Sequence, residues 1–238
     1  MKEHMKNKNG FTLVEALIAL LMGSLVLMAI YSAINTGQIS SSNIESKVTA
    51  QQDTRGAMEL MAMEIQMASY NPQLTQNIWV STTDCLSTSG NQPYKGIQEA
   101  GVNSITVEMD INGNGVIDNT ANNPNEVIRY AYDPTNQYIT RQVNCGTALP
   151  FLGATTANAT TQTVWVVNNA AGIPVFRYYD GQGNALAAPV TNNIPIIRKI
   201  EITLVTKTSN KDIVTAGQRQ IVYTMSVIPR NHALNYIN

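Results

Sequence analysis

Residues 11–34, FTLVEALIALLMGSLVLMAIYSAI, decide the fold, because they are apolar almost throughout and Glu15 is their only charged residue. A helix rises about 1.5 Å per residue, so this segment extends roughly 36 Å as a helix. The hydrocarbon core of a bilayer is about 30 Å thick. We therefore expect residues 11–34 to form a membrane-crossing helix.

The ten residues before this segment, MKEHMKNKNG, carry Lys2, Lys6 and Lys8 against Glu3. Basic flanks stay in the cytoplasm, so we expect the N-terminus inside and the rest of the chain outside. A secretory signal peptide predicts a shorter apolar region that ends in a small-residue cleavage site, and neither is present. A plain membrane anchor fits the length but leaves Glu15 unexplained, because a carboxylate inside an apolar helix costs about 2.5–3.5 kcal/mol.

The junction between the two segments, residues 10–15 with the sequence GFTLVE, resembles the prepilin signal of type IV pilins and type II secretion pseudopilins. The resemblance implies that a prepilin peptidase cuts between Gly10 and Phe11 and that the new terminal Phe11 is N-methylated. It also implies that Glu15 pairs with the N-terminal amine of a neighbouring subunit, so that neither charge is buried alone. A basic leader, a Gly–aromatic junction, a glutamate at fixed offset and a long apolar run together make this match specific.

The sequence stays compatible with a helix beyond the membrane segment, to about Ser69, and Pro72 ends it. Apolar side chains recur close to the helical period, with polar residues opposite them. We expect an amphipathic continuation over residues 35–70 that packs on a sheet. The expected apolar stripe is Ile44, Val48, Met58, Met61 and Ile65, with Met63 and Met67 as further core-filling methionines.

Residues 71–238 contain short alternating runs separated by turns rich in Asn, Gly, Asp and Pro, which predicts an antiparallel sheet. The fold class is α+β and pilin-like, with a long N-terminal helix packed on the sheet. The expected parts are the leader 1–10, the membrane or filament-core helix 11–34, its continuation 35–70 and a globular domain 71–238. The expected strands are 104–109, 126–132, 138–143, 163–167, 175–179, 197–205 and 219–228. We expect the small and polar stretch 148–161 to be a loop.

Several distal segments resemble PilW-like minor pilins and the J-type pseudopilins of type II secretion. They are RKIEITL at 198–204, the strand 220–228, PRN at 229–231 and FRYYDG at 176–181. The resemblance implies an accessory subunit at a filament tip that primes assembly. Its partners would be other minor pilins, the major pilin, an inner-membrane assembly platform and the prepilin peptidase. The chain would contact inner-membrane lipid before assembly and lie at the cell surface afterwards.

An adhesive or DNA-uptake surface on the same scaffold remains the alternative function. The loops 81–96 and 148–161 would carry it. The net charge of −1 gives no global basic field for nucleic acid, so no nucleic-acid partner is predicted.

Catalytic motifs are missing from the sequence, so we expect a structural protein rather than an enzyme. The two histidines are His4 and His232, and a Ser–His–Asp site would depend on His232. There is no phosphate-binding glycine loop and no C-x-x-C motif.

The chain has two cysteines, Cys85 and Cys145. In a cytosolic protein they would be two free thiols, whereas in an exported protein an even count indicates a disulfide. Because export is predicted, we expect a Cys85–Cys145 bridge.

Residues 110–118, DINGNGVID, have the ligand spacing of an EF-hand-type calcium loop. Oxygen-bearing side chains fall at positions 1, 3, 5 and 9, glycine at 6 and a backbone carbonyl at 7. Position 12 is Ala121 instead of glutamate, and the flanks look like strands. The alternative is a hairpin turn, in which Asn-Gly pairs supply the positive φ angles. The candidate calcium ligands are Asp110, Asn112, Asn114, Val116, Asp118 and Glu126.

Overall fold

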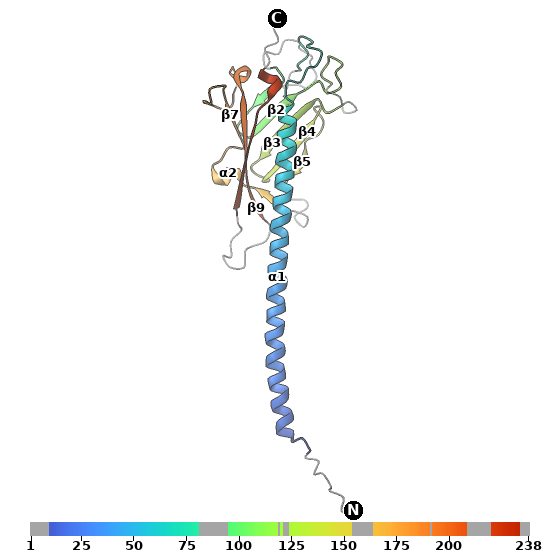
Figure 1. The fold of residues 1–238 in the computed structure, drawn as a ribbon, viewed down its shortest axis with the longest axis vertical. Coiled ribbons are helices and arrows are strands. Elements are labelled where there is room, and N and C mark those ends of the chain that lie inside the picture. The colour runs from blue at the N-terminus through green and yellow to red at the C-terminus, as the bar shows by residue number, and fades with distance from the viewer. Residues whose placement is uncertain are drawn as a thin grey trace, which may run out of the picture. The chain divides into compact units, whose positions relative to one another are not determined.

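One long helix, α1 (Leu13–Gln66), extends through 54 residues of the computed structural model (Figure 1). The structure describes residues 10–80, 95–118, 120, 124–153, 164–190, 192–208 and 220–233. The chain divides into two units, Met1–Glu45 and Ser46–Asn238, and α1 contributes to both. The predicted leader, apart from Gly10, lies outside the described residues.

The first unit consists, in its described part, of the junction and the front half of α1. The apolar window of this helix has a mean hydropathy of 2.5 and no buried residue. Among the described residues, α1 is the helix whose length and apolar composition suffice to cross a membrane. The helix expected over residues 11–34 is therefore confirmed as a helix, starting at Leu13.

The rear half of α1 belongs to the second unit and supplies one buried stripe to its core. Met58, Met61 and Ile65 are buried in it as the periodicity predicts. The prediction is wrong for Ile44 and Val48, which are exposed because the buried stripe begins only at Ala50. It is also wrong for Met63, which lies outside the buried stripe and is exposed. The complete stripe is Ala50, Thr54, Ala57, Met58, Met61 and Ile65.

The strands form two antiparallel sheets where the sequence predicted one. The first sheet has the order β1-β2-β3-β4-β5. Its members are β1 (Ile97–Ala100), β2 (Ser104–Glu108), β3 (Val127–Asp133), β4 (Tyr138–Val143) and β5 (Leu149–Leu152). Strand β4 has the predicted bounds, whereas β5 occupies a stretch expected to be loop. Proline is tolerated on an edge strand, and Pro150 in β5 hides the strand signal.

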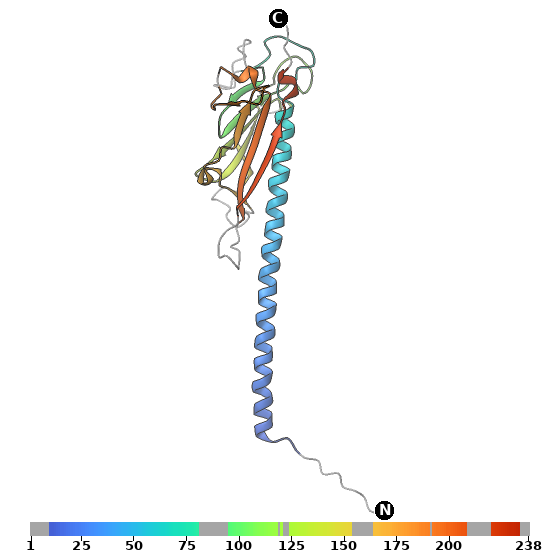
Figure 2. The same ribbon diagram turned by 60° about the vertical axis from the view of Figure 1, so that its left-hand side comes forward.

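The second sheet has the order β10-β9-β7-β8, and β6 also pairs with β9. Its members are β6 (Val164–Val166), β7 (Phe176–Tyr179), β8 (Ala185–Leu186), β9 (Lys199–Thr208) and β10 (Gln220–Val227). The short helices between and after these strands are α2 (Asn168–Ala171), η2 (Ile194–Ile196) and η3 (Arg230–Ala233). Strands β9 and β10 lie beside the rear half of α1 (Figure 2).

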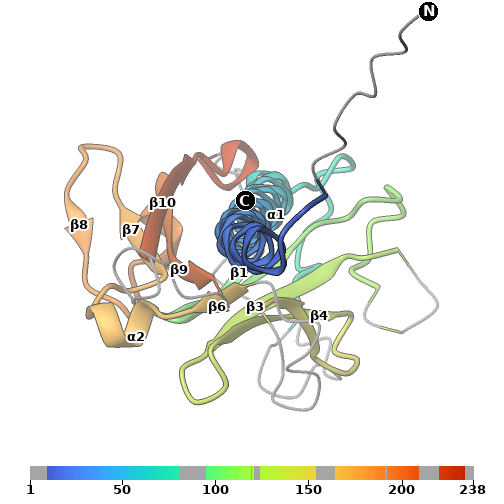
Figure 3. The same cartoon turned by 90° about the horizontal axis from the view of Figure 1, so that it is seen from below.

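A single core joins the rear half of α1 to both sheets. Met61 of α1, Tyr130 of β3 and Ile202 of β9 belong to the same buried cluster. Figure 3 shows the two sheets on adjacent sides of the rear half of α1. The predicted α+β class, with a long helix packed against antiparallel strands, is confirmed.

Candidate functional site

Gly10 and Phe11 lie just before α1, separated from its first residue by Thr12, and both are exposed. A Cβ atom added to Gly10 would meet no other atom within 4 Å, and the Phe11 side chain is 86% exposed. The backbone at this junction is therefore open to a protease that requires access to an unfolded segment.

Thr12 and Glu15 form a capping box at the start of α1. The N–H and the Oγ1 of Thr12 each donate to Oε2 of Glu15 at 2.9 Å, and the N–H of Glu15 donates to Oγ1 of Thr12 at 3.3 Å. This arrangement satisfies backbone donors that the first helical turn leaves unpaired. A carboxylate is also favoured near the positive N-terminal end of a helix.

The role of Thr12 is a feature that the sequence interpretation missed. The signal was present as T-x-x-E at the start of an apolar run, which is typical of a capping box. Glu15 thus has a local partner in the single chain, and it would have to exchange this partner to pair with a neighbouring subunit.

The loop 110–118 is organised by hydrogen bonds from its own backbone. Asp110 accepts N–H groups from Gly113 at 2.8 Å, Asn114 at 3.1 Å and Gly115 at 2.9 Å. Buried Glu126 accepts the N–H of Asp118 at 2.7 Å and belongs to the same network. Burial raises the pKa of Glu126, although the N–H groups of Asp118, Asn112 and Ile111, which donate to it, oppose the shift.

The amide groups of this loop decide how well it fits a cation. The Nδ2 groups of Asn112 and Asn114 donate to Oδ2 of Asp118 at 3.0 and 3.1 Å. Their Oδ1 atoms accept backbone N–H groups two residues further on. Calcium requires oxygen atoms in its coordination sphere, so both amides would have to rotate before they could ligate it. Within the described part of the chain, no cluster of three or more His, Cys, Asp or Glu side chains is arranged to hold a metal.

The calcium prediction for the ligand set given above therefore stays a prediction, and so does the alternative of a self-sufficient turn. Gly113 and Gly115 have φ angles of 70° and 78°, as the alternative requires. Ala121, at position 12, lies outside the described residues.

Cys145 is disulfide-bonded and packs beside a small cluster of Ile78, Trp79, Val80 and Ile117. Its expected partner Cys85 lies outside the described residues, so the Cys85–Cys145 pairing stays a prediction.

The environment of His232 bears on the expectation that the chain is not an enzyme. Its Nδ1 lies 2.9 Å from Oγ of Ser69, and its Nε2 lies 2.8 Å from the carbonyl oxygen of Ile194. Both His232 and Ser69 have no exposed surface. No carboxylate contacts the imidazole among the described residues, and burial lowers the pKa of His232. The contact ties η3 to the turn that follows α1, and a substrate has no access to the hydroxyl.

Three of the distal segments that resemble minor pilins are far apart in sequence but adjacent in the second sheet. Strand β9 pairs with β7 through Phe176 and Ile202, and with β10 through Val227 and Ile200. The PRN segment follows directly and starts η3. These segments therefore form one continuous part of the fold.

The prokaryotic N-terminal methylation motif matches residues 5–31 of the chain. The match covers the second half of the basic leader, the Gly10–Phe11 junction, Glu15 and most of the apolar segment 11–34. No curated protein and no solved structure matches the chain. The motif implies processing by a prepilin peptidase. The methylation motif at the start of a long helix, together with the packing of that helix on antiparallel sheets, supports a type IV prepilin-like protein.

Proposed function

We propose that the mature chain, residues 11–238, is a minor subunit of a type IV pilus or pilus-like filament, acts at its tip and primes assembly. The observation that carries this proposal is Glu15, a carboxylate placed within the first turn of an exposed apolar helix. Burying that helix among other subunits buries the charge, and an unpaired buried charge is strongly destabilising. A partner amine on the next subunit removes this cost.

The capping box supplies a route by which the pairing is exchanged. In the single chain Thr12 holds Glu15 through two hydrogen bonds. A charged terminal amine makes a stronger hydrogen bond to a carboxylate than a neutral hydroxyl does. Cleavage after Gly10 creates that amine on Phe11. The cut therefore supplies the group that draws Glu15 from its own cap to a neighbouring subunit.

The globular unit supports an accessory rather than a repetitive role. It holds two sheets and a disulfide-bonded Cys145, and its second sheet contains the segments that resemble minor pilins. A J-type pseudopilin of type II secretion is the alternative, because it would use the same N-terminus and the same fold. We also propose that the chain performs no catalysis, since the Ser69–His232 contact is buried and no described carboxylate contacts the imidazole of His232.

Replacement of the central carboxylate tests the proposal. We expect Glu15→Ala to be processed and to remain in the membrane, but to fall at least about tenfold in the sheared filament fraction, because a lone amine in the filament core costs several kcal/mol. Glu45→Ala is the matched control, since Glu45 is an exposed glutamate of the same helix. Entry of Glu15→Ala into filaments at the level of the unmodified chain would overturn the proposal.

Loss of the whole chain separates the three roles. A priming subunit predicts few or no filaments, and an adhesin predicts normal filaments that no longer attach. A J-type pseudopilin predicts normal surface pili together with loss of exported enzymes from the medium.

A further inference from the structure

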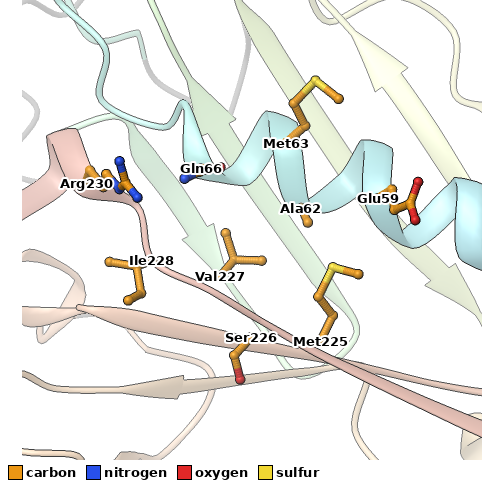
Figure 4. A pocket seen from close by; sticks show the side chains of 9 residues that line it. All are labelled: Glu59, Ala62, Met63, Gln66, Met225, Ser226, Val227, Ile228 and Arg230. Atoms are coloured by element: carbon orange, nitrogen blue, oxygen red, sulfur yellow. The ribbon is translucent and has the colours of Figure 1, made fainter.

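A groove of about 500 Å³ lies between the rear half of α1 and the last strand, β10 (Figure 4). Both of its walls belong to the second unit of the chain. The groove is lined by Glu59, Ala62, Met63 and Gln66 from α1, and by Met225, Ser226, Val227, Ile228 and Arg230 from the C-terminal strand and the segment after it.

The lining residues place the groove along the edge of β10. Side chains of successive strand residues point to opposite faces of a sheet. A groove on one face would therefore be lined by every second residue, whereas this one is lined by the consecutive run 225–228. The α1 residues are spaced i, i+3, i+4 and i+7, which is one face of a helix. The groove thus runs between a helix face and a strand edge.

The edge of β10 carries backbone groups that have no partner among the described residues. Within the described part of the chain, β10 pairs with β9 alone, over eight residues and without a bulge. The N–H of Thr203 in β9 donates to Val175, on the side of β7. Its pairing partner Thr224 must then direct its own N–H and C=O away from β9, because antiparallel pairs alternate between bonded and non-bonded. The same alternation applies to Val222 and Ser226, and no hydrogen bond reaches these outward backbone groups from the described residues.

Strand β10 lacks the features that usually protect an exposed edge. Its sequence, QIVYTMSV, contains no charge and no proline. Such an edge is a template for another strand, whose backbone groups complete the ladder.

The two ends of the groove carry opposite charges. Glu59 stands at one end and Arg230 at the other (Figure 4). Both are exposed, and neither forms an ion pair with another described residue. Between them Met63 and Ile228 are each 57% exposed. The complementary occupant is an extended segment with an uncharged middle, a basic group near Glu59 and an acidic group near Arg230.

A second copy of this chain, paired edge to edge through β10, does not fit. Two identical edges that pair about a two-fold axis run antiparallel, and so do the α1 helices beside them. Subunits anchored by the same end in one membrane present their α1 helices in the same direction. The occupant is therefore not the β10 strand of a second copy.

We infer that the groove between α1 and β10 receives an extended strand from a different, neighbouring pilin-like subunit, which adds to the second sheet along β10. This inference rests on the proposed function, because the filament supplies the neighbour. The added strand extends the second sheet across the subunit boundary.

The test uses the full chain in detergent micelles and a synthetic probe peptide. The probe is a capped peptide of eight residues, the length of β10, with alternating valine and threonine between a terminal lysine and a terminal glutamate. Hydrogen exchange resolved by residue is measured with and without the probe. We expect added protection at Ser226, the outward-facing residue of β10 that lines the groove, and none at the odd-numbered amides of β10, which already bond to β9.

Variants of both walls supply the controls. Ser226→Pro removes one outward N–H and should weaken probe binding at least about fivefold, whereas Ser226→Ala keeps the N–H and should not. Glu59→Lys and Arg230→Glu should each weaken binding roughly two- to fivefold. The double variant Glu59→Lys/Arg230→Glu should regain most of the affinity, because the probe can bind in the reverse direction. Because Glu59 and Arg230 are exposed, their variants should fold, and they test the inference even if Ser226→Pro does not fold.

The results that would contradict the inference can be told apart from the expected ones. Absence of protection along β10, equal binding by Ser226→Pro and Ser226→Ala, or no rescue in the double charge variant would overturn the inference. So would a cross-link between the β10 strands of two copies of this chain. Glu15→Ala should leave probe binding unchanged, so failure of the groove and failure of the filament role are separate results.

Discussion

The guanidinium of Arg141 on β4 forms a bidentate ion pair with the carboxylate of Glu64 on α1. Nη2 lies 2.5 Å from Oε1, and Nε lies 3.1 Å from Oε2. The hydroxyl of Tyr130 on β3 donates to the same carboxylate. Burial, with the bond to Glu64 as a second cause, raises the pKa of Tyr130. This contact fixes the rear half of α1 to the first sheet at two strands.

The first prediction concerns the Glu64–Arg141 ion pair. Glu64→Gln leaves a mostly buried guanidinium without its counter-charge, so we expect the free energy of unfolding to fall by about 1–3 kcal/mol. Thermal and denaturant unfolding of the full chain in detergent measures this loss. The matched control Glu59→Gln removes an exposed glutamate of the same helix and should change the stability by less than about 0.5 kcal/mol.

A double variant checks the assignment to the pair itself. Glu64→Gln together with Arg141→Met should cost less than the two single changes added together, because the second change removes the unpaired charge. Strict additivity would show that the two side chains do not interact.

The second prediction concerns Glu108 and the dependence of stability on pH. Its Oε2 accepts the N–H of Val80 at 3.1 Å and Nε2 of Gln98 at 3.2 Å, while Oε1 has no partner among the described residues. Burial raises the pKa of Glu108 to about 8. The folded state thus binds this proton more tightly than the unfolded state. The contribution of Glu108 to the free energy of unfolding is therefore complete below the ordinary pKa of 4.5. This contribution is lost as the pH rises through about 8.

The slope of this loss is at most about 1.4 kcal/mol per pH unit for a single group. Glu108→Gln cannot titrate and should remove this slope between about pH 5 and pH 8 in melting experiments on the full chain. The same slope in Glu108→Gln and in the unmodified chain would place the titration on another group.

The third prediction concerns the loop 110–118. Asp110 is buried and organises three backbone N–H groups, so Asp110→Ala should destabilise the chain by about 1–3 kcal/mol. The calcium prediction expects millimolar calcium to raise the melting temperature of the unmodified chain but not that of Asp110→Ala. The alternative of a self-sufficient turn expects no calcium-dependent change in either protein.

The sequence was a good guide wherever local chemistry determines the structure. The apolar run around Glu15 predicts the front of α1, and strict alternation predicts the bounds of β4. The capping role of Thr12 was also available, since T-x-x-E is a local pattern.

Long-range pairing was beyond the sequence. The division into two sheets depends on which strands meet, and the Glu64–Arg141 pair joins residues 77 positions apart. Strand β5 was missed because Pro150 and the exposed Leu149 resemble a loop. The groove beside β10 could not be predicted either, because it depends on where α1 lies next to that edge.

The N-terminus of the protein recovered from its host tests the central claim most directly. Intact-mass and N-terminal peptide measurements should give a chain that begins at Phe11 and carries one added methyl group. Gly10→Val is the control for recognition by the peptidase, and we expect this variant to keep the leader. A side chain at position 10 meets no other part of the described structure, so the folded chain should tolerate the change. A mature chain that still begins at Met1, or that begins at any other residue, would contradict the account.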